Sequence, residues 1–248
     1  MSGVKGVILC GGEGKRFRPL SFYLQKVMVP VGPYEKPILE YIVRLFHYYG
    51  VKDLVLLVGY KSNQVQNYFG DGARFDVKIS YVKDDPNYPG NGGALYNAFR
   101  KGALREDETL IVYYGDILSR IDLRAFLEFH EGAVATLAVA EGYRVPVGVA
   151  KVRGERVVYI EEKPVLNMPI TIGVLVIEGT VKGILEEFAE RKKKLDIMGD
   201  IIPALIKRGM PVKAYMYKGF WYDVGSLERL EKLSDELVKK ELSFLFSD

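Results

Sequence analysis

The sequence predicts an α/β fold in which a mixed, mainly parallel central sheet is flanked by helices. An apolar run at residues 7–10 ends abruptly in a glycine-rich segment, as a buried strand does where it leaves a sheet. Strand patterns then alternate with helix patterns through the first half of the chain, which is typical of parallel sheets. The second half has more strand patterns. Together these observations favour a Rossmann-like architecture with a strand-rich second half.

Composition limits the classes of protein that fit. The chain has 248 residues, of which 48% are hydrophobic and 27% are charged, as in a globular protein with one substantial domain. A net charge of +3 does not indicate a nucleic-acid partner. The one cysteine, Cys10, excludes an internal disulfide and a cysteine-built zinc site. Neither a signal peptide nor an apolar run of about 18 residues is present, so we expect a cytoplasmic protein without a membrane partner.

The segment that follows the first strand has the composition of a phosphate-binding loop. Glycine backbone can approach a ligand closely, so that several N–H groups converge on anionic oxygens, and neighbouring cations supply the opposite charge. In open α/β sheets, ligands bind at this end of the strands. The glycines are Gly11, Gly12 and Gly14, and the cations are Lys15, Arg16 and Arg18.

Two familiar phosphate loops do not match this segment. The P-loop needs a glycine well upstream of its Gly-Lys pair and Ser or Thr directly after it, but Leu9 and Arg16 occupy these positions. The dinucleotide-binding pattern, begun at Gly12, needs Gly or Ala where Phe17 stands. The ATPase and NAD interpretations are therefore not supported.

The rest of the first half continues the alternation. We expect a helix between Pro37 and Gly50, with His47 off its apolar stripe and hence at the surface. A strand at 54–58, a helix at 62–69 and strands at 77–82 and 110–114 follow the same reasoning.

Residues 89–98 form a second glycine-rich segment, which we expect to open a helix. The N-terminus of a helix offers unpaired N–H groups, and glycine lets a flat ring lie against the backbone. Gly90, Gly92 and Gly93 would otherwise only weaken the start of this helix. Contact with a ligand therefore explains them better than a simple turn.

Asp116 follows the strand at 110–114. A carboxylate at this end of a central strand points into the crevice where ligands bind. A capping role is the alternative, but Asp122 already offers a cap for the helix at 123–130.

In the second half we expect strands at 133–140, 147–152, 156–160, 170–177 and 212–217, and helices at 181–191 and 198–207. Gly154 joins the second and third of these strands into a hairpin. Near the end, Trp221 is followed by Asp223 and Gly225, and Ser226 rather than Asp223 is free to cap the next helix. The apolar residues at 242–246 should pack on the body or on a partner subunit.

Residues 11–20, with Lys26 and residues 29–31 after them, resemble the signature of the sugar-1-phosphate nucleotidylyltransferases, which reads Gly-Gly-x-Gly-Thr-Arg-Leu-x-Pro-Leu-Thr and then Pro-Lys-Pro and Val-Pro-Val. Residues 90–95, 115–116, 145–149, 161–164 and 221–225 resemble later motifs of that family, in the same order. The chain departs from the signature at Lys15 and Phe17, and at Gln25 and Val27, which replace the two prolines around Lys26.

The resemblance implies roles for particular residues. Asp116 and Asp223 would hold Mg²⁺, and with Arg16 and Lys26 they form the catalytic set. Substrate contacts are implied for Leu9, Gly11, Gly12, Gly14, Lys15, Gly90, Gly92, Gly93, Gly148, Glu162, Lys163 and Gly173. Among these, Gly148 and Glu162 would contact sugar hydroxyls and Lys163 the sugar phosphate. The family often has Asn-Ala-Gly where this chain has Thr171-Ile172-Gly173.

The resemblance also implies one nucleotidyltransferase domain over 1–248, with a nucleotide-binding half at 1–120, a sugar-binding half at 121–225 and a C-terminal helix and tail at 226–248. The implied reaction joins an NTP and a sugar-1-phosphate to give an NDP-sugar and pyrophosphate. Mannose-1-phosphate guanylyltransferase and glucose-1-phosphate uridylyl- or thymidylyltransferase types both remain open, as does a homo-oligomer. The alternatives are transfer to a non-sugar phosphorylated alcohol and a non-catalytic regulatory subunit that binds a nucleotide sugar.

Overall fold

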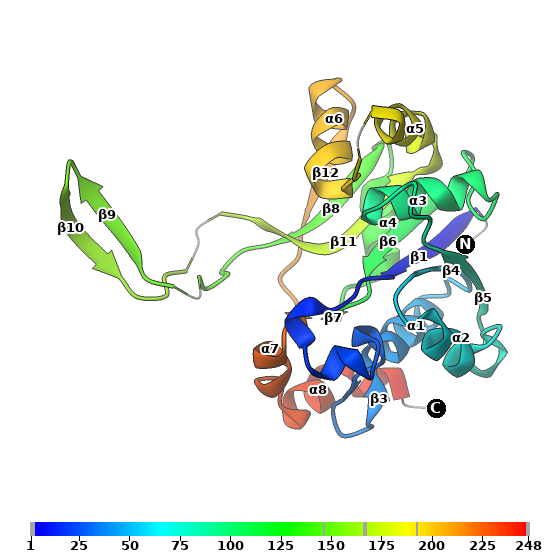
Figure 1. Cartoon of the computed structure of the whole chain (residues 1–248), viewed down its shortest axis with the longest axis horizontal. Helices are drawn as coiled ribbons and strands as arrows, with labels where there is room; N and C mark the ends of the chain where they lie inside the picture. Colours follow the sequence, from blue (N-terminus) through cyan, green and yellow to red (C-terminus); the bar gives the residue numbers. More distant parts are fainter. Residues whose placement is uncertain (1–2, 146, 166–167, 192, 247–248) are drawn as a thin grey trace.

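The computed structural model describes residues 3–145, 147–165, 168–191 and 193–246. Within them lies a seven-stranded sheet in the order β12-β8-β11-β6-β1-β4-β5 (Figure 1). β11 runs antiparallel to β6 and β8, and the other neighbouring pairs are parallel. The predicted mixed, mainly parallel sheet is therefore confirmed. Its strands are β1 (Val4–Cys10), β4 (Asp53–Val58), β5 (Lys78–Lys83), β6 (Thr109–Tyr114), β8 (Ala135–Ala140), β11 (Ile170–Glu178) and β12 (Val212–Met216).

Helices cover both faces of the sheet because side chains alternate along each buried strand. On β1, Val7 belongs to the apolar cluster of α3, α5 and α6, whereas Ile8 and Cys10 belong to the cluster that includes α1, α2, α4 and α8. The helices described are α1 (Ile38–Tyr48), α2 (Ser62–Phe69), α3 (Asn91–Arg100), α4 (Leu123–His130), α5 (Lys182–Arg191), α6 (Ile202–Lys207), α7 (Leu227–Glu231) and α8 (Asp235–Leu242). None of them has both the length and the apolar character that crossing a membrane requires.

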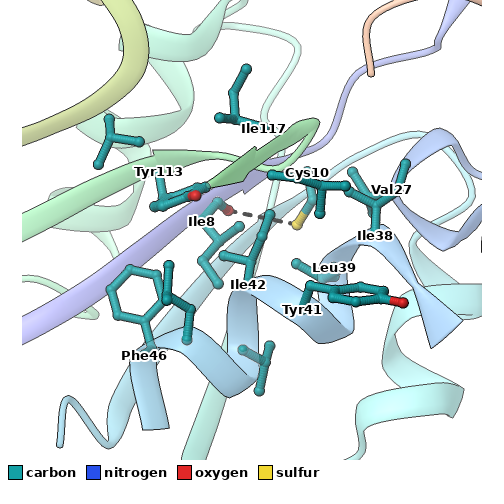
Figure 2. Close-up of a cluster of buried hydrophobic side chains, with 14 of the residues drawn as sticks. Ile8, Cys10, Val27, Ile38, Leu39, Tyr41, Ile42, Phe46, Tyr113 and Ile117 are labelled. Atoms are coloured by element: carbon teal, nitrogen blue, oxygen red, sulfur yellow. Dashed lines mark hydrogen bonds between the residues drawn. The ribbon is translucent and has the colours of Figure 1, made fainter. Parts of the chain in front are cut away.

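Figure 2 shows the cluster on the α1 side of β1. Ile8 packs toward Ile42 and Phe46 of α1, and the Cys10 thiol donates a hydrogen bond of 3.6 Å to the Ile8 carbonyl oxygen. Burial raises the pKa of Cys10 far above its ordinary value. The thiol is thus a buried hydrophobic group with a weak donor, as the sequence indicated.

Two predicted helix caps are confirmed. The Asp122 carboxylate accepts hydrogen bonds from the backbone N–H groups of Arg124 and Ala125 at the start of α4. The Ser226 hydroxyl accepts a hydrogen bond from the Arg229 N–H at the start of α7. Asp116 and Asp223 are therefore not needed as caps of these helices.

The end of the chain packs on the body, as expected. A 3₁₀ turn at Ser243–Phe246 follows α8, and the Phe246 ring stacks on Tyr34 with ring centroids 4.3 Å apart. Leu245 is buried, and Arg44 of α1 lies over the Phe246 ring. This segment closes the apolar cluster on the α1 side of the sheet.

The predicted helix at 198–207 is wrong in one respect. The structure divides it into a π-helical turn, Ile197–Ile201, and α6. Pro203 has no N–H to donate to a carbonyl four residues earlier, so a continuous α-helical ladder cannot pass this point. The Asp196 side chain caps the π turn by accepting from the Gly199 N–H.

Two short sheets join segments far apart in sequence. β2 (Pro30–Val31) pairs with β3 (Lys36–Pro37), and β7 (Ile117–Ser119) pairs antiparallel with β13 (Trp221–Asp223). The second of these brings residues 221–223 beside β7, the strand that follows β6.

The predicted hairpin in the second half forms, but it lies outside the central sheet. β9 (Val149–Arg153) and β10 (Arg156–Glu161) pair only with each other among the described residues. Figure 1 shows them extending from the ends of β8 and β11, away from the helices and the sheet. Every residue of both strands is exposed. We call β9 and β10 with their turn the arm.

Candidate active site

A cleft of about 730 Å³ lies at the carboxyl ends of the parallel strands. It is lined by residues that directly follow β1, β4, β5 and β6, because parallel strands end at the same edge of a sheet. Of the residues predicted from the sequence, six line it: Leu9, Gly11, Gly12, Lys26, Gly90 and Asp116.

Pairing of β7 with β13 brings the two predicted aspartates together. Asp223 lies opposite Ile117 in this pairing, and the Val224 N–H donates a hydrogen bond of 2.8 Å to the Asp116 carbonyl oxygen. Burial raises the pKa of Asp223, and the negative charge of Asp116 raises it further. Residues more than a hundred positions apart thus form one anionic pair, of which Asp116 lines the cleft.

Cationic side chains neutralise this pair. The Lys26 ammonium donates a hydrogen bond to the Asp116 carboxylate, and the Arg229 guanidinium donates one to the Asp223 carboxylate. Arg16 also lies close to this pair, and its positive charge lowers the pKa of Asp223. A Cβ atom added at Gly225 would lie 2.5 Å from Asp223 Oδ1 and 3.1 Å from Arg16 Nη2, so both groups border this glycine.

Arg229 is a residue of this site that the sequence analysis missed. Its guanidinium also donates a hydrogen bond of 2.9 Å to the Tyr143 hydroxyl, at the base of the arm. Tyr143 in turn stacks on Trp221, with ring centroids 6.4 Å apart. The only signal in the sequence was a basic residue a few positions after Asp223, which is too common a pattern to identify it.

The first glycine-rich segment turns away from the sheet through Gly14, whose φ is 61°. Gly12 faces open space, whereas a Cβ atom at Gly11 would lie 2.4 Å from the Asp84 carboxylate. Lys15 forms an ion pair of 3.3 Å with Glu13, and its side chain is 71% exposed. The structure therefore turns Lys15 toward solvent rather than into the cleft.

Gln25 holds this segment in place, a role that the sequence did not suggest. Its side chain is buried, and Nε2 donates to the carbonyl oxygens of Cys10 at 2.6 Å and Gly12 at 3.4 Å. Its Oε1 accepts from the Val27 N–H. Gln25 thus links the glycine bend to the turn that bears Lys26, where the family signature has a proline.

The second glycine-rich segment is shaped by close packing against the protein's own backbone. A Cβ atom at Gly93 would lie 2.1 Å from the Tyr88 carbonyl oxygen, and one at Gly90 would lie 2.2 Å from the Leu195 carbonyl oxygen. A Cβ atom at Gly92 would lie 2.8 Å from Leu195 Cγ. Close packing thus gives these glycines a role besides the predicted ligand contact, and Gly90 also lines the cleft. Nucleotide contact here stays a prediction.

The residues predicted to contact the sugar lie at the base of the arm and do not line the cleft. Lys163 Nζ is 3.9 Å from Glu162 Oε1, and both side chains are exposed. A Cβ atom at Gly148 would lie 2.9 Å from Glu162 Oε2, which places these residues side by side. The hydrogen bond from Lys232 lowers the pKa of Glu228 in α7 most, and the charge of Lys163 lowers it further. Gly173, with a φ of 76°, packs against Tyr114.

The structure brings together the four residues predicted as the catalytic set. Arg16, Lys26, Asp116 and Asp223 lie together, while Lys163 lies on the α7 side of the arm and its ion pair is with Glu162. Sequence motifs report which residues are present, but the position of the arm relative to the sheet depends on packing that no motif encodes.

Asp84 is a further acidic residue that the sequence analysis missed. It follows β5 and lines the cleft beside Gly11 and Gly59. Among the described residues its carboxylate has no hydrogen-bond partner and no ion pair, and burial raises its pKa. Its only signal in the sequence was its place after the strand predicted at 77–82.

Comparison of the whole sequence with known protein families identifies the class of protein. Residues 5–240 match the model of a family described as nucleotidyl transferase. The chain therefore belongs to that family, and the resemblance found in its motifs is confirmed.

Three characterised relatives are particularly similar. The chain is 28% identical over 241 residues to UTP–glucose-1-phosphate uridylyltransferase of Synechocystis, covering 90% of this chain and 61% of that protein. It is 29% identical over 248 residues to mannose-1-phosphate guanylyltransferase of Mycobacterium tuberculosis, covering 95% and 65%. It is 33% identical over 168 residues to D-glycero-alpha-D-manno-heptose 1-phosphate guanylyltransferase of Aneurinibacillus thermoaerophilus, covering 64% and 68%. The chain thus spans less than two thirds of the length of the first two.

Solved structures share the fold. A Bacillus anthracis structure in complex with sucrose has a TM-score of 0.75 at 23% identity, covering 95% of each chain. HddC from Yersinia pseudotuberculosis, solved with GMP-PN, has a TM-score of 0.70 at 24% identity, covering 94% of this chain and 98% of that one.

Proposed function

We propose that the protein transfers the nucleotidyl group of an NTP to a sugar-1-phosphate, releasing pyrophosphate and forming an NDP-sugar. The observation that supports this most directly is the group of Arg16, Lys26, Asp116 and Asp223 beside a glycine bend at the sheet edge. The relatives named above transfer uridylyl or guanylyl groups to sugar phosphates, which favours this reaction over a non-sugar acceptor.

The reaction needs no general base. A phosphate-monoester oxygen of the sugar-1-phosphate attacks the α-phosphorus of the NTP, and the bond from that phosphorus to the bridging oxygen of pyrophosphate breaks. The second pKa of a phosphate monoester is about 6, so the attacking oxygen is already deprotonated at neutral pH. Among the described residues no histidine lines the cleft, which agrees with this chemistry.

The protein must instead bring two anions together and neutralise them. Arg16 and Lys26 are the cations beside the aspartate pair, and we assign them to the phosphates of the NTP. Gly12 leaves open space at the bend, so the backbone can approach those phosphates. Lys163 on the arm is assigned to the phosphate of the sugar.

Asp116 and Asp223 fit a magnesium ion. No group of three or more metal-binding side chains was found among the described residues, but Mg²⁺ is commonly held by one or two carboxylates together with substrate phosphates. Burial raises the pKa of Asp223 most, and repulsion by the Asp116 carboxylate adds to it; a divalent cation would relieve that repulsion. When bound, the ion would stabilise negative charge on the phosphate oxygens.

The test is pyrophosphate release with GTP, UTP, dTTP, ATP and CTP, each paired with several hexose-1-phosphates. We expect one or a few pairs to react and phosphocholine not to replace the sugar phosphate. Nucleotide-sugar binding without turnover for every pair would favour the regulatory-subunit alternative. The cytoplasmic location and the division at 1–120 and 121–225 stay predictions, open to cell fractionation and limited proteolysis.

Asp116→Asn should lower the rate of pyrophosphate release by about 100-fold or more, since it removes one charge from the proposed magnesium site. Thermal unfolding should change little, because the amide is isosteric. Asp76→Asn, at an exposed aspartate paired with Lys52, is the matched control and should keep the wild-type rate. Unchanged turnover in Asp116→Asn would refute the metal assignment.

A further inference from the structure

Residues 59–64 run from the end of β4 into the first turn of α2 and hold the loop that follows β1. The Tyr60 N–H donates a hydrogen bond of 2.9 Å to the Gly11 carbonyl oxygen at the start of that loop. The Tyr60 hydroxyl donates another, also of 2.9 Å, to the Ser21 carbonyl oxygen farther along it. Because β4 pairs with β1, the sheet sets the position of residues 59–64 beside the loop.

Gln64, in the first turn of α2, holds the end of the same loop with both ends of its side-chain amide. Its Nε2 donates a hydrogen bond of 2.8 Å to the Tyr23 carbonyl oxygen, and its Oε1 accepts one of 2.7 Å from the Gln25 N–H. Gln25 is the residue directly before Lys26, and it caps the 3₁₀ turn Lys26–Met28. Gln64 is therefore bonded to the backbone from which Lys26 projects.

These bonds stand where the family signature has prolines. A proline has no N–H, and its ring fixes φ near −65°. The φ of Gln25 is −63°, so its backbone already has the conformation of a proline. The N–H groups of Gln25 and Val27, which the two prolines would remove, donate to the side chains of Gln64 and Gln25. Hydrogen bonds to two glutamines thus fix in this chain what two rings fix in the signature.

We propose that Gln64 is a positioning residue for Lys26, acting through the backbone of Gln25. The inference rests on the proposed function, in which Lys26 binds the phosphates of the NTP. The Lys26 ammonium donates to the Asp116 carboxylate, and its side chain is only 16% exposed. A small shift of its backbone therefore moves this cation relative to Asp116 and to the cleft. Displacement of a catalytic group by about 1 Å costs on the order of 100-fold in rate.

Gln64→Met tests the proposal, because it keeps the length of the side chain and removes both hydrogen bonds. We expect kcat for pyrophosphate release to fall by about tenfold. The melting temperature should fall by no more than about 4 °C, as expected for the loss of one or two hydrogen bonds at a half-buried position. Gln66→Met is the matched control on the same helix, since in the described part of the chain the Gln66 side chain has no bond to residues 11–28. It should keep the wild-type kcat.

Restoring the prolines separates positioning from a general role in stability. In the background Gln25→Pro/Val27→Pro, the N–H groups that need the glutamines are absent, and the rings fix the backbone. Adding Gln64→Met to this background should lower kcat by less than about twofold. A role of Gln64 confined to the stability of α2 would give the same loss of rate in both backgrounds, and that result would overturn the proposal.

The rate of acetylation of Lys26 by an N-hydroxysuccinimide ester, mapped by mass spectrometry on the substrate-free chain, gives a second readout. Loosening the backbone should free the ammonium from Asp116, so Gln64→Met should raise the rate by about fivefold. Gln66→Met should leave it unchanged. A wild-type chain that releases no pyrophosphate from any substrate pair would count against the proposed function, and the acetylation rates would still decide the role of Gln64. Unchanged acetylation of Lys26 in Gln64→Met would overturn it.

Discussion

At the scale of single residues, glycines of the two loops serve different purposes. Gly12 faces open space at the bend after β1, whereas Gly93 lies against the Tyr88 carbonyl oxygen. The same residue type therefore leaves room for a ligand in one loop and room for the protein's own backbone in the other. The sequence alone could not separate these cases, because both glycines lie in similar glycine-rich motifs.

Gly12→Ala and Gly93→Ala should consequently have opposite effects. Gly12→Ala should keep the wild-type melting temperature but raise the KM for the NTP by about tenfold, because its methyl group enters the cleft. Gly93→Ala should lower the free energy of unfolding by about 1–3 kcal/mol, because its methyl group overlaps the Tyr88 carbonyl. Thermal melts and NTP titrations separate the two. Equal loss of stability in both variants would contradict this assignment.

Arg229 affects the charge state of Asp223. Its positive charge lowers the pKa of that carboxyl group, against burial and Asp116, which raise it. Arg229→Met should therefore raise the pKa of Asp223, so that the acid limb of the pH–rate profile moves to higher pH. Arg208→Met, which removes a surface pair with Glu187, is the control and should leave the acid limb in place. A shift of that limb to lower pH in Arg229→Met would contradict the sign.

At the scale of elements, a buried polar cluster joins α4, β8 and β11. His130 Nδ1 is 2.7 Å from the Thr136 hydroxyl, and Nε2 is 2.9 Å from Glu178. Burial lowers the pKa of His130 below its ordinary value of 6.5, although Glu178 opposes this shift. The three elements are thus held together best when the imidazole is neutral.

This cluster predicts a loss of stability in mild acid. Below pH ~6.5 the unfolded chain binds a proton at His130 more readily than the native protein does, so the free energy of unfolding should fall as pH falls from there to the lower native pKa. Urea unfolding of the wild type and of His130→Gln, at pH ~7.5 and ~5.5, measures the difference. The variant should lose less stability across this interval. An equal pH dependence would contradict the prediction.

At the scale of the whole molecule, the proposed sugar contacts lie on the arm and outside the cleft. Lys163 and Glu162 lie at its base, exposed, while the aspartate pair lies at the edge of the sheet. Tyr143 connects the two regions through Arg229. The position of the arm should therefore affect the proposed binding of the sugar phosphate more than that of the NTP.

Lys163→Ala should raise the KM for the sugar-1-phosphate by about tenfold and leave the KM for the NTP unchanged, because it removes one cation from the acceptor side only. Lys151→Ala, on the arm but away from its base, should change neither constant. Steady-state kinetics with each substrate varied in turn gives both values. An increase confined to the NTP would contradict the assignment of Lys163.

The sequence by itself determined the class of fold and the family, and it singled out the residues proposed as the catalytic set. Alternation of apolar runs and helix patterns specifies a parallel sheet, and the position of Gly11, Gly12 and Asp116 after strands places them at one edge. These inferences succeed because they depend on local periodicity and on topology. Caps at Asp122 and Ser226 were predictable for the same reason.

Only the tertiary structure decided the rest. The pairing of β7 with β13, the buried Gln25 under the glycine bend, the Arg229 bond to Asp223 and the extension of the arm all join segments that are distant in sequence or depend on packing. Such contacts form because buried polar groups must find partners and apolar faces must be covered, and neither requirement says in advance which distant residue will meet it.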